Sequence, residues 1–171
     1  MLDTLTHLVP LDQADPAAVE RLLDAAFGTD RHRRTAYRLR EGVAPIASLS
    51  LAALDADGRL AGSLQSWPVK LTQTDGTSVP LVLVGPVAVD PAIQRQGLGR
   101  EMMAHMLDVA DATGAAPQVL IGDPEYYGRF FGFTADQTGG WDLPGPFERR
   151  RLLARTGERV LPAHGMIGPR P

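Results

Sequence analysis

Two closely spaced glycines flanked by arginines carry the strongest chemical signal in this sequence. Gly97 and Gly99 follow an apolar, strand-like run and open a helical pattern, with Arg95 and Arg100 beside them. A glycine lets the backbone approach a ligand closely because it has no Cβ. The first turn of a helix adds N–H groups without intrahelical partners and a partial positive charge. The spacing therefore predicts an anion site suited to a pyrophosphate.

Two common phosphate-binding loops do not fit this segment. No Gly-x4-Gly-Lys-Ser/Thr sequence occurs in the chain. A dinucleotide loop needs a third glycine where this chain has Met102, and an acidic residue about 20 positions further on. Val119 and Leu120 stand there instead. A helix start that happens to carry two glycines is the remaining alternative from the spacing alone.

The loop resembles the acyl-CoA loop of the GNAT superfamily of N-acetyltransferases, Gln/Arg-x-x-Gly-x-Gly/Ala, at every fixed position. The preceding residues 87–91 resemble that family's approach strand, and Gly85-Pro86 is similar to the bulge that splays this strand from the next one. A splayed strand can pair with the amide-rich arm of CoA. The resemblance implies acetyl-CoA or another acyl-CoA as cosubstrate, without a metal. The residues it implies for the cofactor are Val87, Ala88, Val89, Gln94, Arg95, Gln96, Gly97, Leu98, Gly99, Arg100, Tyr126 and Phe130.

A second segment, residues 122–133, strengthens the resemblance. Its sequence Gly-Asp-Pro-Glu-Tyr-Tyr-Gly-Arg-Phe-Phe-Gly-Phe is similar to the closing motif of the superfamily, and specifically to the YhbS-like bacterial branch. The family usually has Tyr-x-x-x-Gly-Phe, whereas Tyr127 lies five positions before Gly132. This one-residue insertion leaves open whether Tyr126 or Tyr127 faces the thioester.

The reaction implied by the resemblance is direct attack of a primary amine on the thioester in a ternary complex. A backbone N–H near Val87 or Val89 is expected to polarise the carbonyl. Tyr127 is the expected general acid for the departing sulfur, with Tyr126 as the alternative. Asp90 and Asp123 are the candidates for the base.

Each of these candidates also has a purely structural interpretation. Tyrosines beside several phenylalanines commonly pack in a core, and Asp123-Pro124 fits a helix cap. The run Arg31-His32-Arg33-Arg34 could favour an acidic or phosphorylated acceptor, but it is also typical of a solvated charge cluster.

The elements that must position these residues follow from periodicity and turn signals. We expect helices at 16–27, 37–40, 98–114 and 124–131, and strands at 48–54, 60–72, 79–89 and 119–121, followed by further strands. A charged run at 148–151 could open another helix. This order indicates an α+β, GNAT-like fold with a mixed, mostly antiparallel central sheet, a splayed strand pair and helices on both faces.

Bulk composition excludes several classes of function. The 171 residues suit a single acyltransferase domain, 1–171, with a poorly ordered tail from about residue 160. A net charge of -3 argues against nucleic-acid binding. The chain has no cysteine, its four histidines lack metal-ligand spacing, and no apolar run is long enough for a membrane span. We therefore expect a cytoplasmic protein.

Two functions remain after these exclusions. The first is an N-acetyltransferase that acts on a small-molecule or protein amine. The second is a non-catalytic acyl-CoA-binding regulatory module, because the glycine loop serves both equally. The sequence leaves a homodimer open.

Overall fold

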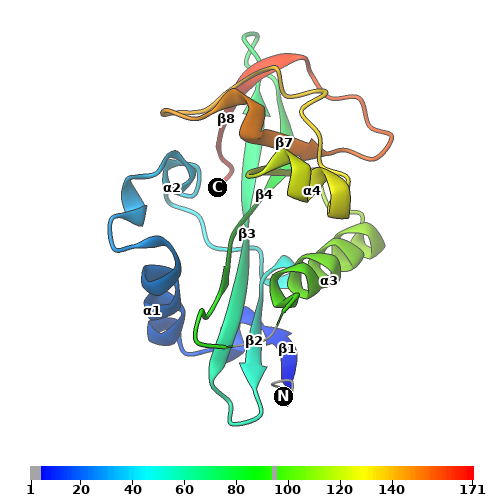
Figure 1. Ribbon diagram of the computed structural model, residues 1–171. Coiled ribbons are helices and arrows are strands. Elements are labelled where there is room, and N and C mark those ends of the chain that lie inside the picture. Colours follow the sequence, from blue (N-terminus) through cyan, green and yellow to red (C-terminus); the bar gives the residue numbers. More distant parts are fainter. Residues whose placement is uncertain (1–4, 94–95) are drawn as a thin grey trace. The chain divides into compact units, whose positions relative to one another are not determined.

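The computed structural model describes residues 5–93 and 96–171, which form two compact units built from interleaved segments. Unit 1 contains the chain up to His32, then Pro45–Ser66 and Gly85–Gly114. Unit 2 contains Arg33–Ala44, Trp67–Val84 and Ala115–Pro171. The two long strands β3 (Leu60–Thr72) and β4 (Ser78–Val89) pass from one unit into the other (Figure 1).

Unit 1 is built on antiparallel strands. β1 (Thr6–Pro10) pairs with β2 (Leu51–Asp55), and β2 pairs with the first half of β3. Two helices belong to this unit, α1 (Pro16–Phe27) and α3 (Leu98–Thr113), together with the short 3-10 turns η1 (Leu11–Gln13) and η3 (Ala47–Leu49). A further turn, η2 (Arg31–Arg33), lies where the chain leaves unit 1.

Both helices of unit 1 begin and end at the residues that the sequence indicates. The Asp15 carboxylate accepts the Ala17 amide proton at 3.1 Å and caps α1, and Gly28 ends this helix with a φ of +90°. Gly97 and Gly114 bound α3, with φ values of +80° and +66°. Glycine suits these ends because side chains rarely adopt such angles.

The two helices cover opposite faces of the strands in unit 1. Val19, Leu22 and Leu23 of α1 pack with Ala52 of β2 and Ala88 of β4. On the other face, α3 lies so close that a Cβ at Gly62 would come 3.0 Å from Met102 Cε and 3.3 Å from Leu98 Cδ2. The expected helices on both faces of the sheet are therefore present in this unit.

Unit 2 carries the remaining elements: α2 (Thr35–Arg38), β5 (Gln118–Ile121), α4 (Pro124–Phe131), β6 (Gly140–Asp142), η4 (Arg149–Arg151), β7 (Leu152–Arg155) and β8 (His164–Pro169). β5 pairs in parallel with β4 and antiparallel with β7, while β8 pairs antiparallel with β3 and in parallel with β6. Trp67 and Trp141 are buried in the core of this unit.

The ladder between β4 and β5 is short. It pairs Val82 with Gln118 and Leu83 with Val119, whereas β4 is 12 residues long. Gly85, two residues after Leu83, has a φ of +126°, which is far from regular strand geometry. The predicted α+β fold with a mixed, mostly antiparallel sheet and a splayed strand pair is confirmed.

Several elements differ from the sequence-based expectation. The expected strand at 48–54 starts at Leu51, because η3 occupies Ala47–Leu49. The run at 148–151 opens no helix: it forms η4, and the leucines that follow pair with β5. The tail from residue 160 contains β8, and its Ile167 and Gly168 pair with Leu71 and Lys70 of β3.

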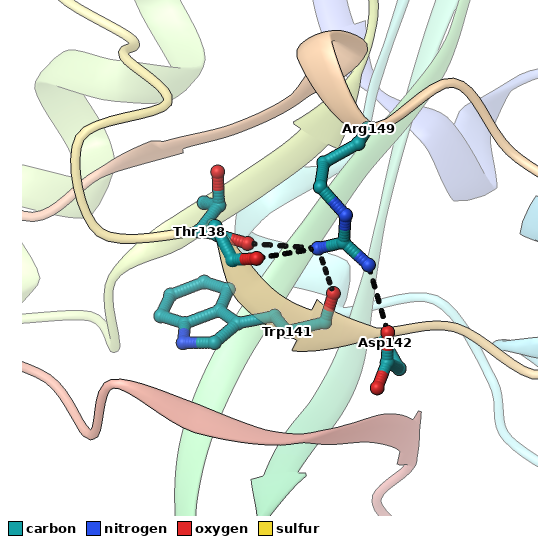
Figure 2. Close-up of polar contacts among 5 residues, drawn as sticks. Thr138, Trp141, Asp142 and Arg149 are labelled. Atoms are coloured by element: carbon teal, nitrogen blue, oxygen red, sulfur yellow. Dashed lines mark hydrogen bonds and ion pairs between the residues drawn. The ribbon is translucent and has the colours of Figure 1, made fainter.

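Arg149 holds the short strand β6 from the segment before β7 (Figure 2). Its Nη1 donates to the carbonyls of Gly139 at 2.8 Å and Trp141 at 2.9 Å, and its Nη2 lies 2.8 Å from the Asp142 carboxylate. One guanidinium thus holds three neighbouring residues, for which a planar fork with several donors is suited. The structure therefore gives one arginine of the 148–151 run a role within the fold.

Candidate functional site

The amino terminus of α3 lies at the loop that the sequence predicts to bind an anion. Gly97 is the N-cap residue in the left-handed conformation, and Glu101 N donates to its carbonyl at 2.9 Å to close the first turn. Within residues 5–93 and 96–171, no side chain caps this end of the helix. The positive end of the α3 dipole is therefore open to a ligand.

The described residues leave room beside both glycines. A Cβ at Gly97 would meet no atom of the described residues within 4 Å. A Cβ at Gly99 would make only ordinary contacts, 3.8 Å from Val89 Cγ2 and 4.0 Å from Val87 Cγ1. Packing among the described residues therefore does not require a glycine at 99.

The β4 residues next to this loop are divided between the two faces of unit 1. Val87 and Val89 turn their side chains toward Gly99, and Ala88 packs in the cluster under α1. Asp90 N donates to the carbonyl of Ala61 in β3 at 2.9 Å. Since N–H groups alternate sides along an antiparallel strand, those of Val87 and Val89 point away from β3. These are the two amides that the sequence suggests for the thioester carbonyl.

The remaining predicted loop residues are only partly described. Gln94 and Arg95 lie outside the described residues. Gln96 and Arg100 are exposed, and Leu98 is buried and anchors the start of α3. An exposed arginine in the first turn would add positive charge to the predicted anion site.

Unit 2 carries the aromatic segment that the sequence singles out. Tyr126 and Tyr127 of α4 meet edge to face with ring centroids 4.9 Å apart. Phe130 lies 5.3 Å from Tyr126 and is 36% exposed. Phe133, immediately after the Gly132 cap, is buried and lies 6.2 Å from Tyr127. α4 therefore presents a continuous aromatic cluster.

Tyr127 packs tightly against the segment that precedes α4. Its ring lies against Gly122, where a Cβ would come within 2.5 Å of Tyr127 Cε2. Burial raises the pKa of Tyr127, and the neighbouring Tyr126 adds to this shift. The phenol therefore keeps its proton at neutral pH, as a general acid must. Gly122 belongs to the quoted motif, but the sequence alone does not indicate this packing role for it.

The structure assigns cap roles to the two candidate aspartates. Asp123 is the N-cap of α4 and accepts from Glu125 N at 3.1 Å. Its hydrogen bonding with Glu125 holds the pKa of this exposed carboxylate below the ordinary value. Asp90 accepts from Ala92 N at 2.8 Å in the turn after β4. Both contacts match the structural interpretation offered by the sequence.

Arg31 takes neither of the roles considered for the Arg31–Arg34 run. It is 2% exposed, forms a hydrogen-bonded ion pair with Glu20, and lies 3.2 Å from Asp24. Its charge is therefore neutralised by α1 and is not presented to an acidic acceptor. His32 and Arg33 are exposed.

The described residues lack two further features. No helix among them is both long and apolar enough to cross a membrane. Outside positions 1–4 and 94–95, no group of three or more His, Cys, Asp and Glu side chains is arranged to hold a metal ion.

The chain is similar to known acetyltransferases over most of its length. Residues 8–135 match the family model of the acetyltransferase (GNAT) domain. The chain is 32% identical over 116 residues to a protein of Escherichia coli K12 described as the uncharacterized N-acetyltransferase YhbS. This match covers 68% of the chain and 66% of YhbS, slightly less than two thirds of that relative.

Two crystal structures show the same fold over nearly the whole chain. The structure of YhbS from Escherichia coli in complex with CoA superposes with a TM-score of 0.71 at 25% identity, covering 99% of this chain and 91% of that one. A GNAT family acetyltransferase from Brucella melitensis in complex with acetyl-CoA gives a TM-score of 0.64 at 25% identity, covering 98% and 97%.

Proposed function

Because the chain belongs to the GNAT acetyltransferase family, we propose that it transfers an acetyl group from acetyl-CoA to a primary amine. The observation that carries the proposal is the open amino terminus of α3, where Gly97 and Gly99 leave space beside helix N–H groups. The similar structures from Escherichia coli and Brucella melitensis hold CoA and acetyl-CoA, which supports the same cosubstrate here.

The pyrophosphate would bind at the first turn of α3, and the exposed Arg100 would add positive charge. The pantetheine arm would pair with the edge of β4 that points away from β3. Gln94, Arg95, Gln96, Tyr126 and Phe130 are proposed as further cofactor contacts on the strength of the family motif. An exposed ring such as Phe130 can cover an apolar part of a ligand.

In the reaction, the amine nitrogen forms a bond to the acetyl carbon while the C–S bond breaks and the thiolate takes a proton. Positioning the amine beside the thioester removes several kcal/mol from the barrier by itself. The Val87 or Val89 amide would donate to the carbonyl oxygen, where negative charge develops. Both amides belong to the strand β4, so they need little rearrangement when the negative charge develops.

Tyr127 is proposed as the general acid for the thiolate. A thiol has a pKa near 8.5, so the leaving group needs only modest help. The raised pKa of Tyr127 keeps the proton available, and the packing against Gly122 fixes the ring. Tyr126 remains the alternative donor within the same cluster.

The proton of the attacking amine is proposed to leave through water. Asp123, which the sequence suggests as a base, has its pKa lowered and its oxygen engaged in the α4 cap. A more acidic carboxylate is a weaker base, so we assign it the cap alone. An Asp123→Asn variant separates the roles, since asparagine also caps helices.

Release of free CoA thiol, measured with and without a primary amine, tests the proposal. The expected result is amine-dependent thiol release matched mole for mole by acetylated amine, for a small-molecule or a protein acceptor. Acetyl-CoA that binds but gives no release with any amine would contradict catalysis and identify a binding module. Sedimentation would test the homodimer, which stays a prediction.

A further inference from the structure

A cavity of about 370 Å³ lies within unit 1, apart from the α3 loop. Its walls come from η1, the first turns of α1, the segment around η3 as far as Ser50, and Gln65 of β3. This volume falls in the range of small-molecule sites. Every lining residue belongs to unit 1, so the cavity is a feature of that unit alone.

A single hydrophobic cluster connects the cavity with β4. Ala14 and Val19 line it, and both pack in the same cluster as Ala88. Ala88 stands between Val87 and Val89, the residues proposed to polarise the thioester carbonyl. A molecule in the cavity would therefore lie on the α1 face of the strand that is proposed to hold the acetyl group.

Charge and polarity in the cavity indicate the chemistry of its occupant. Most of the lining is apolar, as at Leu11 and Val19, and the exposed Asp12 adds a carboxylate. Glu20 also lines the cavity, but its carboxylate is paired with Arg31. Among the described residues that line it, no side chain is basic. A carboxylate such as that of Asp12 beside an apolar wall favours a cation with an apolar body.

Two buried polar side chains add hydrogen-bonding groups. Gln65 is 7% exposed and Ser50 is 3% exposed, and both line the cavity. Ser50 Oγ accepts the Ser66 amide proton at 3.1 Å, so its own hydroxyl proton can be donated to another group. Buried polar atoms facing an apolar cavity are the pattern of a specific small-molecule site.

We infer that this cavity binds the acceptor, and that the acceptor is a small cationic amine with an apolar body. The inference rests on the proposed acetyltransferase function and names its substrate class. It differs from the acidic acceptor considered for the Arg31–Arg34 run, because Arg31 is neutralised by Glu20 and Asp24 while the carboxylate of Asp12 lines the cavity.

Phenethylamine and O-phosphoethanolamine are suitable probes, since both are primary amines but differ in their apolar body and negative charge. Ala47 is exposed at the cavity, so Ala47→Trp would narrow it with little effect on the fold. The next residue, Ser48, is also exposed but does not line the cavity, so Ser48→Trp is the control for a new indole in η3. Asp12→Asn removes a lining charge, with the exposed hairpin residue in Asp57→Asn as its control.

Calorimetric titration of phenethylamine in the presence of CoA, and acetylation rates with acetyl-CoA, are measured for each protein. We expect Ala47→Trp to weaken phenethylamine binding about 10-fold or more and Ser48→Trp to leave it within about 2-fold. Asp12→Asn should weaken it about 2- to 5-fold, and less at high salt. Wild-type kcat/KM should be at least about 10-fold higher for phenethylamine than for O-phosphoethanolamine.

Phenethylamine binding that Ala47→Trp and Ser48→Trp change equally would overturn the inference, as would a preference for O-phosphoethanolamine. Titration of acetyl-CoA alone distinguishes this failure from failure of the proposed function. If acetyl-CoA binds and the cavity variants have no effect, only the acceptor assignment is wrong. If acetyl-CoA does not bind, the proposed function fails, and the acceptor assignment that rests on it is withdrawn.

Discussion

The ring of Tyr127 packs directly on Gly122, with Cε2 within 2.5 Å of the position a Cβ would occupy there. Gly122→Ala must therefore displace the ring of the proposed acid. We expect a loss of about 1–3 kcal/mol in unfolding free energy and a lower kcat. Denaturant unfolding and steady-state kinetics measure both. Gly139→Ala is the control, because a Cβ there meets no atom of the part of the chain that the structure describes within 4 Å. Unchanged stability in Gly122→Ala would refute this packing.

Removing only the hydroxyl of Tyr127 separates its chemistry from its packing. Tyr127→Phe keeps the contacts with Gly122 and Phe133 but cannot protonate the thiolate. We expect kcat to fall about 10-fold or more while KM for acetyl-CoA is unchanged, since acid catalysis acts on the chemical step. The kcat of Tyr126→Phe should stay within about 2-fold of the wild-type value if Tyr127 is the acid. A full rate in Tyr127→Phe would remove Tyr127 from the mechanism.

The raised pKa of Tyr127 also predicts a pH dependence of stability. The native state favours the neutral phenol, whereas an unfolded tyrosine ionises near its ordinary pKa of about 10. Above that pH the unfolded chain holds fewer protons than the native protein, so stability falls as pH rises. Below the ordinary tyrosine pKa, the contribution of Tyr127 to the unfolding free energy does not vary with pH. Urea unfolding between about pH 8 and pH 11 should show a shallower alkaline decline in Tyr127→Phe than in wild type. Identical slopes would contradict the shift.

Arg31 is expected to matter for stability and little for cofactor binding. Its buried guanidinium is paired with Glu20 and Asp24. Arg31→Ala should lower the unfolding free energy by about 2–4 kcal/mol, because it removes a buried ion pair and opens a cavity. Arg33→Ala changes an exposed neighbour, so we expect an effect below about 0.5 kcal/mol. Equal stabilities in thermal unfolding would show that Arg31 is not part of the core.

The sequence predicts well the elements that local signals delimit. Asp15-Pro16 and Gly28 bound α1, Gly114 ends α3, and Asp123-Pro124 starts α4. Each is a cap residue that acts on its own neighbours in the chain. The glycine loop is predictable for the same reason, because the helix start and the space beside it are both local properties.

Elements that depend on distant pairing could not be predicted in this way. β1 has few apolar residues and gives no strand signal of its own, since its pairing with β2 defines it. β8 contains glycine and proline and resembles a loose tail, yet it pairs with β3 about 95 residues earlier in the chain. The cavity could not be predicted from the sequence for a similar reason, because lining residues such as Asp12 and Gln65 come together only after folding.

Calorimetric titration of acetyl-CoA into the wild-type protein and Gly99→Glu tests the central claim most directly. The first added carbon makes only ordinary contacts with Val87 and Val89, so the fold should persist while the carboxylate occupies the proposed pyrophosphate space and repels a phosphate. We predict binding to wild type and at least about 10-fold weaker binding to Gly99→Glu, with Gly139→Glu unchanged. No binding to wild type, or equal binding to both glycine variants, would contradict the placement of acetyl-CoA at α3.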